Sequence, residues 1–452
     1  MSGSESLEGW IERQLAVSTE RLLASVSATG LSRPGPRVGQ VMVPAPGSVL
    51  AYAQPRPGPD EPDYFFHWIR DAALIIDALV TLYRRGRLLA AARRRFAESV
   101  AFDRGLLRID GRALVESEGW PPEVYPQQQP WLRPGEEVVR LRGRAVLDDV
   151  RYNADGTPDV VRWSRPQHDG PAKRALTTLK LLQHGALESD AERRQAALLL
   201  AGDLGYTLSR HARPSYDPWE EELGFHFYTR LVQHAALRRG AEWAAATGRP
   251  RAAGRLAAAA AVQAAALAGH WSAADGFYGS RLPGPGISPE KNLDGIVLLA
   301  VLHAGLADGP YSVLDPKVAA TVERLEAFFA GYLPINAGRG PADGVLLGRY
   351  AGDRYFEGGA FPIACFGLAE FRYRRAATGA RSEAARELAR GDAVLGFMRR
   401  FLPESGMLPE QLDRVTGAPR SARDLTWSHA ALVTAADARA AACSAVARSA
   451  AG

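Results

Sequence analysis

Helix-length stretches separated by connections of two very different lengths dominate this sequence. Amphipathic or Ala/Leu-rich segments with helical periodicity recur along the whole chain, whereas alternating β-branched runs are nearly absent. The periodicity therefore predicts an all-α protein, with helices near 6–28, 70–84, 87–105, 170–184, 190–209, 223–246, 249–270, 289–306, 315–331, 358–378, 382–402 and 423–447.

The connections between these predicted helices alternate between long and short. A link such as Arg85-Gly86 has only a few residues, whereas the long segments are rich in Gly, Pro and Trp and lie at 29–69, 106–169, 210–222, 271–288, 332–357 and 403–422. Six antiparallel helix pairs joined in this way suit a closed double ring in which all long loops emerge at one end. We predict an (α/α)6 barrel with long loops at one end. Such a ring also explains a single domain, residues 1–452, well above the usual size.

The basic residues are spread along the chain instead of forming a patch. The 55 Lys and Arg residues against 50 Asp and Glu residues leave a net charge of +5, and nearly all of the cations are Arg interspersed with acids. Nucleic-acid binding would need a clustered basic patch or a motif. We therefore expect no nucleic-acid partner.

Cysteine usage and the N-terminal sequence bear on the cell compartment. Cys365 and Cys443 cannot form a disulfide framework and have no metal-ligand spacing, so we expect a reducing compartment, no metal and no cofactor. The start MSGSESLEGWIERQL carries acids where a signal peptide needs a basic region, and no segment reaches about 20 apolar residues. These features predict a cytoplasmic protein that makes no membrane contact.

Five of the six long loops, or the helix starts that follow them, carry dense clusters of aromatic, carboxylate and Arg residues. Sugars present apolar C–H faces that stack on Trp and Tyr, and hydroxyl edges that hydrogen-bond to Arg and carboxylates. The clusters therefore indicate a carbohydrate site. They are Tyr64 to Asp71 (YFFHWIRD), Trp163 to Pro171 (WSRPQHDGP), Tyr216 to Glu222 (YDPWEEE), Gly348 to Tyr355 (GRYAGDRY), and Pro409-Glu410-Gln411 followed by Ser421 to Trp427 (SARDLTW).

Taken in order, the five clusters resemble the signature of glycoside hydrolase family 15, the glucoamylases. Their order and approximate spacing match over roughly residues 40 to 435, and RPQHDGP and SARDLTWS are close to the sequences of fungal members. The resemblance implies an exo-acting, inverting hydrolase that releases β-D-glucose from the non-reducing ends of soluble maltooligosaccharides or related α-glucans. No Ser/Thr- or Pro-rich linker leads to an appended module, so we expect one catalytic domain without a starch-binding domain.

Two glutamates of these clusters form the candidate catalytic pair. Hydrolysis of a glycosidic bond needs one carboxylic acid to protonate the leaving oxygen and a second carboxylate on the other face of the sugar. The resemblance makes Glu220 the general acid and Glu410 the general base. An inverting pair leaves room for a water, so we expect roughly 6.5–9.5 Å between the two carboxyl groups.

The other matches assign a glucose-binding pocket. By resemblance, Arg70 and Asp71 grip the hydroxyls of the non-reducing end, which makes the pocket blind and the action exo. The remaining substrate-binding residues are Tyr64 and Trp68 beside the reacting centre, Trp163 as a platform over the acid, Arg349 as a clamp on ring hydroxyls, Glu221 at the leaving-group sugar, Trp427 closing the pocket, and Arg165 and Trp219 in the same clusters.

Some residues of the clusters are predicted to stabilise the fold and not to bind substrate. Asp169 stands before Gly170-Pro171 at a predicted helix start, where an aspartate caps the helix N-terminus. We assign a structural role to Arg423-Asp424 as well. Glu222 is expected on a solvated face.

Departures from the family pattern leave the linkage open. His67 and Ile69 stand where the common pattern has Thr, and the run from Tyr355 to Phe361 replaces an Asn-Gly-Asn-Pro-Trp ending near the leaving-group side. A trehalase or an isomaltose- or dextran-directed glucosidase of the same family is one alternative. A non-catalytic glucan-binding scaffold is another, and the retention of Glu220 and Glu410 argues against it.

The longest loop, 106–169, is a feature of its own. It carries Trp120, Tyr125 and Trp131 together with an acidic-basic, hairpin-like stretch. A loop of this length suffices to form a lid or to narrow the mouth of the site.

Overall fold

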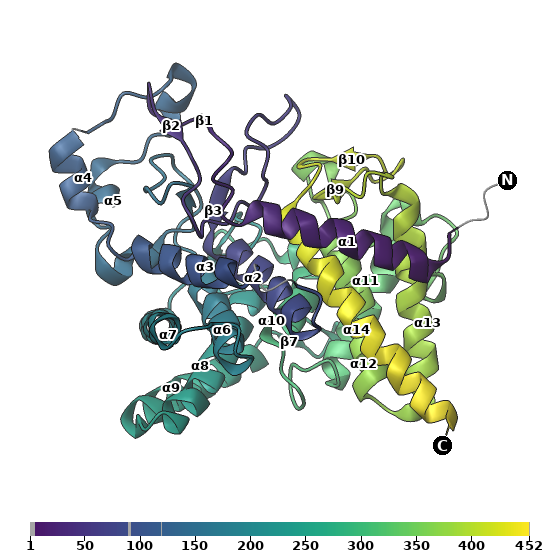
Figure 1. Cartoon of the computed structure of the whole chain (residues 1–452). Coiled ribbons are helices and arrows are strands. Elements are labelled where there is room, and N and C mark those ends of the chain that lie inside the picture. The colour runs from purple at the N-terminus through teal and green to yellow at the C-terminus, as the bar shows by residue number, and fades with distance from the viewer. Residues whose placement is uncertain (1–4, 89–91, 119, 452) are drawn as a thin grey trace.

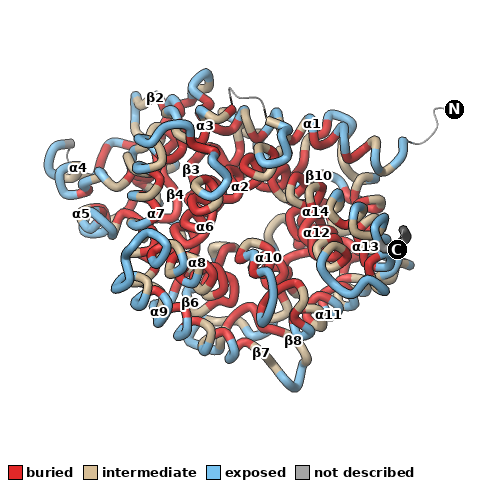
Figure 2. The backbone as a smooth tube through the Cα atoms, turned by 60° about the horizontal axis from the view of Figure 1, so that its bottom comes forward, coloured by how far each residue is buried: buried red, intermediate tan, exposed pale blue. Residues whose placement is uncertain are grey.

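The computed structural model describes residues 5–88, 92–118 and 120–451 (Figure 1). Six helices form an inner ring in which each packs against the next, and the last packs back on the first (Figure 2). These helices are α2 (Ile69–Arg84), α6 (Asp169–Gln183), α8 (Phe227–Ala246), α10 (Ile296–Ala304), α12 (Pro362–Thr378) and α14 (Thr426–Ala451).

Six further helices form an outer layer around this ring (Figure 2). Among the pairs of one inner and one outer helix, the most extensive contacts join α8 to α9 and α12 to α13, each pair being a hairpin with a short link. The predicted all-α fold and (α/α)6 barrel are therefore confirmed. The outer helices are α1 (Leu7–Ser25), α3 (Arg93–Leu106), α7 (Asp190–Arg210), α9 (Pro250–Ala268), α11 (Pro316–Tyr332) and α13 (Arg381–Met398).

The hydrophobic pattern explains why the helices divide into two layers. Every residue of α12 from Pro362 to Tyr373 is buried, including the charged Glu370 and Arg372. The helix α10 is buried except at His303, as expected of a helix that is apolar all round. Outer helices bury a single stripe instead. In α9 this stripe consists of Leu256, Ala259, Ala260, Gln263 and Leu267, which follow helical spacing.

All six inner helices begin at the same end of the barrel. Each of them follows a long connection, and the five before α14 end at shorter links, such as residues 247–249 between α8 and α9 or residues 379–380 between α12 and α13. Their N-termini, which are the positive ends of the helix dipoles, therefore lie beside the long loops.

The long loops contain more local structure than the sequence predicted. The loop 106–169 includes α4 (Gly111–Glu118), α5 (Gly135–Val139) and strand β4 (Arg151–Asn153), which pairs antiparallel with β3 (Phe66–Trp68). Its 3-10 helices are η2 (Pro126–Trp131) and η3 (Gly143–Asp148). Elements this short bury too few residues to show a period in the sequence.

Further short elements shape the other long loops. Two-residue strands form the hairpins β1–β2 (Arg33–Pro34, Val41–Met42), β5–β6 (Ser215–Tyr216, Leu223–Gly224), β7–β8 (Trp271–Ser272, Phe277–Tyr278) and β9–β10 (Gln411–Leu412, Pro419–Arg420). The 3-10 helices are η4 (Pro289–Lys291), η5 (Pro334–Asn336), η6 (Pro341–Asp343), η7 (Tyr355–Glu357) and η8 (Arg399–Phe401).

Several predicted helix starts lie too early in the chain. The helix expected from 289 begins at Ile296, because Pro289–Lys291 form only a 3-10 turn. The helix expected from 358 begins at Pro362, because Ala360 bridges to Leu412 and a Cβ on Gly359 would lie 1.8 Å from the Leu412 carbonyl oxygen. The helix expected at 87–105 begins at Arg93, and residues 89–91 of that prediction lie outside the described residues.

One helix is more apolar than the sequence analysis allowed. The segment Thr426–Arg448 of α14 is long and apolar enough, by length and mean hydropathy, to cross a membrane. It packs against α12, α1 and α2, and it closes the inner ring. This packing buries 39% of its most apolar stretch.

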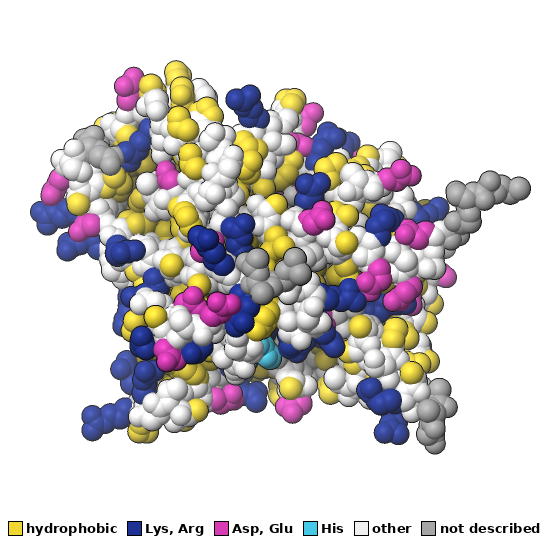
Figure 3. Space-filling model, in the orientation of Figure 1, with side chains coloured by type: hydrophobic (Ala, Val, Ile, Leu, Met, Phe, Trp, Pro, Cys, Tyr) yellow, Lys and Arg dark blue, Asp and Glu magenta, His cyan; other side chains and the backbone are white. Residues whose placement is uncertain are grey.

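Charges of both signs share the surface. On the face in Figure 3, Lys and Arg side chains alternate with Asp and Glu side chains. Exposed ion pairs such as Arg13–Glu5 and Arg87–Glu12 join the two signs. This face therefore presents no continuous basic patch of the kind that tracks a phosphate backbone.

Buried charge between the inner and outer layers yields a stability prediction. Arg372 of α12 is fully buried and pairs with Glu326 and with Glu387, both also buried. Removing one partner of such a pair costs about 3–5 kcal/mol, so Arg372→Met should lower the midpoint in scanning calorimetry by several degrees. Arg112→Met is the control, because it removes only an exposed pair with Glu116 and should leave the midpoint in place. Equal midpoints for both variants would show that the buried network does not stabilise the barrel.

Candidate active site

A cavity of about 200 Å³ lies at the long-loop end of the barrel, among the N-termini of the inner helices. The structure brings both candidate catalytic glutamates and eight of the ten expected substrate-binding residues to its wall. The two glutamates and these eight residues are Tyr64, Trp68, Arg70, Asp71, Trp219, Glu220, Glu221, Arg349, Glu410 and Trp427.

A tight loop between β5 and β6 presents Glu220 to the cavity. The Asp217 carboxylate accepts the backbone N–H groups of Glu221 and Glu222 at 2.9 and 2.8 Å. The Glu220 N–H donates to the Asp217 carbonyl at 2.9 Å. Glu220 has a φ of +68°, a left-handed conformation that costs a non-glycine residue about 1–3 kcal/mol. The hydrogen bonds around Asp217 hold this strained backbone.

Three neutral side chains donate hydrogen bonds to the Glu220 carboxylate. Its Oε1 accepts from Trp68 Nε1 and from Gln167 Nε2, each at 2.9 Å, and its Oε2 accepts from Trp163 Nε1. Arg70 lies further away, with Nη2 at 3.8 Å from Oε1. Trp163 therefore contacts the candidate acid, although it does not line the cavity itself.

The residue before β9, Glu410, stands on the other wall. Its backbone N–H donates to the Ala422 carbonyl at 2.8 Å, and its Oε2 accepts hydrogen bonds from Tyr355 Oη at 3.1 Å and from Ser421 Oγ. Burial raises the pKa of Glu410 above its ordinary value, and the hydrogen bonds from Ser421 and Tyr355 partly offset this effect.

An aromatic wall joins the two glutamates. The Tyr64 hydroxyl lies 2.6 Å from the Tyr355 hydroxyl, which donates to Glu410. The Tyr64 ring packs edge-on against Trp68 with a centroid distance of 5.4 Å, and the Trp68 indole donates to Glu220. The two carboxyl groups thus stand at opposite ends of one wall, as an acid and a base on two sides of a sugar ring require.

Arg70 and Asp71 occupy the first turn of α2. Arg70 donates to Gln167 at 2.8 Å and to Asp169 at 3.2 Å, and it lies 3.5 Å from Asp71. Burial raises the pKa of Asp71 to about 7, with a further increase from the charge of Glu220 and an opposite effect from Arg70. Asp71 Oδ2 is buried and has no hydrogen-bond partner among the described residues. It is therefore an acceptor that a bound hydroxyl would satisfy.

Trp427, in the first turn of α14, forms the floor of the cavity. It also lines another cavity, of about 490 Å³, whose other walls come from α2, α6, α10, α12 and α14. The His303 ring backs Trp427 at a centroid distance of 5.9 Å and is hydrogen-bonded to the Tyr228 hydroxyl at 2.8 Å. The floor therefore separates the site from the far end of the barrel.

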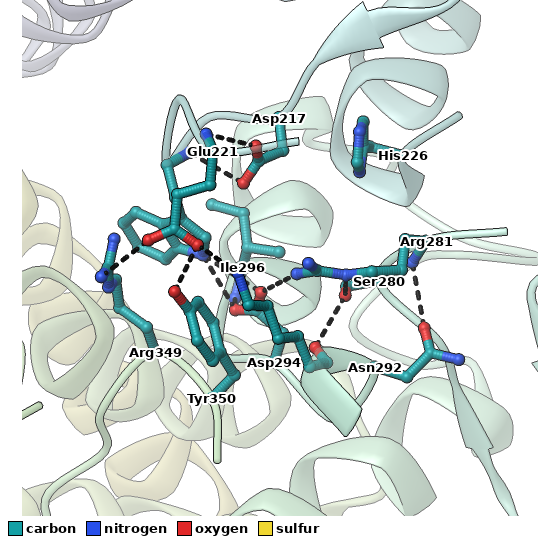
Figure 4. Close-up of polar contacts among 12 residues, drawn as sticks. Asp217, Glu221, His226, Ser280, Arg281, Asn292, Asp294, Ile296, Arg349 and Tyr350 are labelled. Carbon is teal, nitrogen blue, oxygen red and sulfur yellow. Dashed lines mark hydrogen bonds and ion pairs between the residues drawn. The ribbon is translucent and has the colours of Figure 1, made fainter. Parts of the chain in front are cut away.

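Glu221 lies in a network of polar side chains at the side of the cavity (Figure 4). Its carboxylate lies 3.0 Å from Arg349 Nη2 and 2.9 Å from Lys291 Nζ, and it accepts a hydrogen bond from the Tyr350 hydroxyl. Burial alone would raise the pKa of Glu221, but Arg349, Tyr350 and Lys291 together hold it below its ordinary value. Glu221 is therefore an ionised acceptor in a fixed position.

A second layer of charge supports this loop. Trp219 Nε1 donates to Asp294 at 3.1 Å, and Asp294 pairs with Arg281 at 2.9 Å (Figure 4). Arg281 also pairs with Glu222 at 2.8 Å. Glu222 is buried, so the expectation of a solvated face was wrong: it is a counter-charge for Arg281.

Arg165 lies outside the cavity, which corrects its assignment to substrate binding. Its guanidinium pairs with the fully buried carboxylates of Asp149 and Asp159. Arg133 and Arg151 complete this buried cluster by pairing with the same two aspartates. The charge of Arg165 is therefore used to neutralise the interior of the loop 106–169.

A structural role was expected for Asp169 and for Asp424, and the structure agrees with the expectation only for Asp424. Asp169 is the first residue of α6 and pairs with Arg70 at 3.2 Å, while the N-cap position is His168, which makes no side-chain cap hydrogen bond. The prediction of an Asp169 cap was wrong. Asp424 accepts from the Leu408 N–H at 3.2 Å and from His429 at 2.8 Å, which is a structural role, as expected.

Sequence reasoning missed three residues that contact the candidate catalytic pair. Gln167 bonds to Glu220, and Tyr355 and Ser421 bond to Glu410. All three belong to the five clusters, so membership of a cluster was the available signal. Their roles depend on the directions of their side chains, which spacing does not supply.

Cysteines and metal ligands contribute nothing to this site. Cys365 is free and buried, and Cys443 is free and partly exposed. Among the described ranges, no group of three or more His, Cys, Asp or Glu side chains could hold a metal ion.

A blind pocket of aromatic and charged side chains, with carboxyl groups at both ends of one wall, is the site of a glycoside hydrolase. The sequence model of the family described as "Glycosyl hydrolases family 15" matches residues 16–437, so the chain belongs to glycoside hydrolase family 15. The order of its five clusters and its barrel both agree with that membership.

Glucoamylases are among the relatives of this chain. A glucoamylase of Blastobotrys adeninivorans is 27% identical over 456 residues, covering 87% of this chain and 67% of that protein. Glucoamylase 1 of Rhizopus oryzae is 25% identical over 486 residues, covering 97% of this chain and 72% of that protein. The structure of a family 15 glucoamylase from Hypocrea jecorina matches with a TM-score of 0.76 at 22% identity, covering 96% of this chain and 72% of that one.

The position of Arg165 yields a prediction. Because Arg165 neutralises buried carboxylates away from the cavity, Arg165→Met should lower the thermal midpoint while changing KM for a glucoside by less than about twofold. Arg349→Met is the contrasting variant, since Arg349 lines the cavity, and it should raise KM. A large increase in KM for Arg165→Met at unchanged stability would return Arg165 to the substrate site.

Proposed function

We propose that this protein is an exo-acting, inverting α-glucosidase of the glucoamylase type, which releases β-D-glucose from the non-reducing ends of soluble maltooligosaccharides or related α-glucans. One observation carries the proposal: Glu220 and Glu410 face a single blind cavity from opposite ends of the wall formed by Trp68, Tyr64 and Tyr355. Its membership of family 15 and the glucoamylases among its relatives support it.

Glu220 acts as the general acid. Its proton passes to the glycosidic oxygen as the bond between that oxygen and the anomeric carbon breaks. The carboxylate that forms is stabilised by the indole N–H groups of Trp68 and Trp163 and by the amide of Gln167. These donors are neutral, so Glu220 can lose and regain its proton without breaking a close ion pair.

Glu410 acts as the general base. It accepts a proton from a water whose oxygen attacks the anomeric carbon on the face opposite the leaving group. Tyr355 and Ser421 hold the carboxylate in place through its Oε2, which leaves Oε1 for the water. A single displacement inverts the anomeric configuration, so an α-linked substrate gives β-glucose.

The cavity selects the end of a chain. Arg70 and Asp71 stand in its depth and offer charged partners to sugar hydroxyls, and the ring face stacks against the aromatic wall. Trp427 closes the floor, so a glucan enters only by its terminal unit. Glu221 and Arg349 lie at the side, where they contact the leaving-group sugar.

The cellular setting is also part of the proposal. Both cysteines are free, which supports a reducing, cytoplasmic location. That these residues form a single catalytic domain, and that its partners include neither nucleic acid nor a membrane, remain predictions of the sequence.

The product anomer tests the mechanism directly. Proton NMR of a fresh digest of maltose should show the β-glucose signal rising first, before mutarotation mixes the anomers. The Glu220→Gln variant is the control, and its kcat should fall by about 10²–10⁴-fold because the amide has no proton to give. An initial rise of α-glucose would exclude Glu410 as a base acting through water. Parallel digests of isomaltose and trehalose report the linkage that the enzyme prefers.

The Ser421 hydroxyl yields a prediction for the pH profile. Its hydrogen bond favours the ionised form of Glu410, so Ser421→Ala should raise the pKa of Glu410 further. The base must be ionised, so the acid limb of the kcat/KM profile should move to higher pH by about one unit. Ser405→Ala, in the same long loop but outside the cavity, is the control and should leave the limb in place. An unmoved limb for Ser421→Ala would show that Glu410 does not control it.

A further inference from the structure

A cavity of about 490 Å³ lies on the other side of Trp427, the floor of the catalytic cavity. We call it the distal cavity. Its walls come from α2, α6, α10, α12 and α14, and of the described residues that line the two cavities only Trp427 is common to both. The distal cavity is therefore a separate space that the proposed hydrolysis does not use.

Basic side chains outnumber acidic ones around the distal cavity. Behind its wall, the buried Lys173 pairs with Asp77 at 2.6 Å, and Lys180 pairs with the same carboxylate at 2.7 Å. With Lys173 included, five cations share three carboxylates. Among the described residues that line the cavity itself, these charges are Arg84, Arg85, Lys180 and Arg374 against Asp77, Glu370 and Asp437.

Two neighbouring arginines of the lining share one carboxylate. Asp437 accepts a hydrogen bond from Arg84 Nη2 at 3.2 Å and another from Arg85 Nε. A guanidinium has five N–H donors, and within the described part of the chain each of these two guanidinium groups donates a single hydrogen bond. Most of their donors are therefore available to a further acceptor.

The helix ends at this cavity do not cancel the excess of cations. Arg84 and Lys180 stand in the last turns of α2 and α6, where the helix carbonyls carry a partial negative charge that attracts cations. This attraction is screened by salt and falls off within the last turn. Loss of water contacts lowers the pKa of the nearby His184, and the charges of Arg84 and Lys180 lower it further. The surroundings of the cavity therefore disfavour one more positive charge.

Charged and apolar residues of the lining lie at different depths. The side chains of Arg84 and Arg85 are 48% and 45% exposed, so they stand at the mouth. Leu74 and Leu302 are buried and lie further in, with Trp427. The volume of the cavity falls within the range of roughly 300–1,000 Å³ that suits a small organic ligand. A ligand that matches this lining has an anionic group at one end and an apolar body at the other.

We propose that the distal cavity binds a small phosphate monoester, with the phosphate at the mouth beside Arg84, Arg85 and Lys180 and the organic body toward Trp427. A phosphate monoester carries about −1.5 to −2 charges at neutral pH and three strong acceptor oxygens, which matches the excess of two cations and their unused donors. Arginine also pairs with phosphate through two parallel N–H donors. The site goes beyond the proposed function, because such a ligand binds outside the catalytic cavity.

Calorimetric titration with phenyl phosphate, at constant ionic strength, tests this inference. The wild-type protein should bind one equivalent with a Kd below about 1 mM. Replacing both arginines, in Arg84→Gln/Arg85→Gln, should raise the Kd roughly tenfold, because charge-assisted hydrogen bonds to the phosphate are lost. The matched control is Arg13→Gln, which removes an arginine that is 46% exposed, pairs with Glu5 and does not line the cavity. It should leave the Kd within about twofold of the wild-type value.

Lys180→Met tests the same site from a different helix. It leaves Asp77 paired with the buried Lys173, so the fold should be retained, which circular dichroism checks. The Kd for phenyl phosphate should again rise. If the wild-type protein does not bind phenyl phosphate, or if the folded variants bind it as the wild type does, the inference is overturned. In the second case, loss of binding in saturating glucose would assign the anion to the catalytic cavity.

Inorganic phosphate distinguishes a monoester from a free anion. It should bind at least about fivefold more weakly than phenyl phosphate, because it leaves the apolar depth of the cavity empty. Equal affinities would overturn the assignment to a monoester. Cleavage of maltose is measured separately, so failure of this inference leaves the proposed function in place, and failure of the proposed function leaves the anion site in place.

Discussion

The common direction of the six inner helices is the constraint on which this site depends. Each inner helix follows a long loop, so all six N-termini meet at one end, and each brings backbone N–H groups without helical partners and a partial positive charge. Several carboxylates gather in this field, among them those of Asp71, Asp169, Glu220 and Glu410. The same direction places the five sequence clusters on one side of the ring. The barrel thus supplies both the electrostatics and the geometry of the pocket.

The loop between β5 and β6 places three consecutive glutamates, Glu220, Glu221 and Glu222, in different electrostatic surroundings. Glu220 is held mainly by neutral donors, Glu221 by Arg349 and Lys291, and Glu222 by Arg281. The left-handed backbone at Glu220, fixed by the Asp217 carboxylate, turns the first side chain away from the cations that bind the other two. Of the three, Glu220 therefore has the longest ion pair, at 3.8 Å to Arg70, which fits the acid role that we propose for it. The local strain is offset by the hydrogen bonds that Asp217 accepts.

Periodicity and spacing predicted the two-layered ring. The buried face of a helix appears in the sequence as a repeat of apolar residues, and the lengths of the links appear as the distances between helical segments. They missed the two-residue hairpins and the true start of α12, which depend on contacts with distant segments such as Leu412. The clusters identified most of the cavity wall. They failed for Arg165 and Glu222, because a charged residue that neutralises a buried partner looks, in sequence, like one that binds a substrate or faces solvent.

The closed floor has a consequence for the part of the substrate that is not cleaved. Trp427 and His303 block the barrel axis, so a glucan that enters by its terminal unit must leave the rest of its chain at the mouth. The loop 106–169 stands at that mouth, where buried pairs of Arg and Asp residues hold it together. Its Trp163 donates a hydrogen bond to Glu220. The ring and its helix N-termini therefore shape the cavity itself, and the loop 106–169 shapes the approach to it.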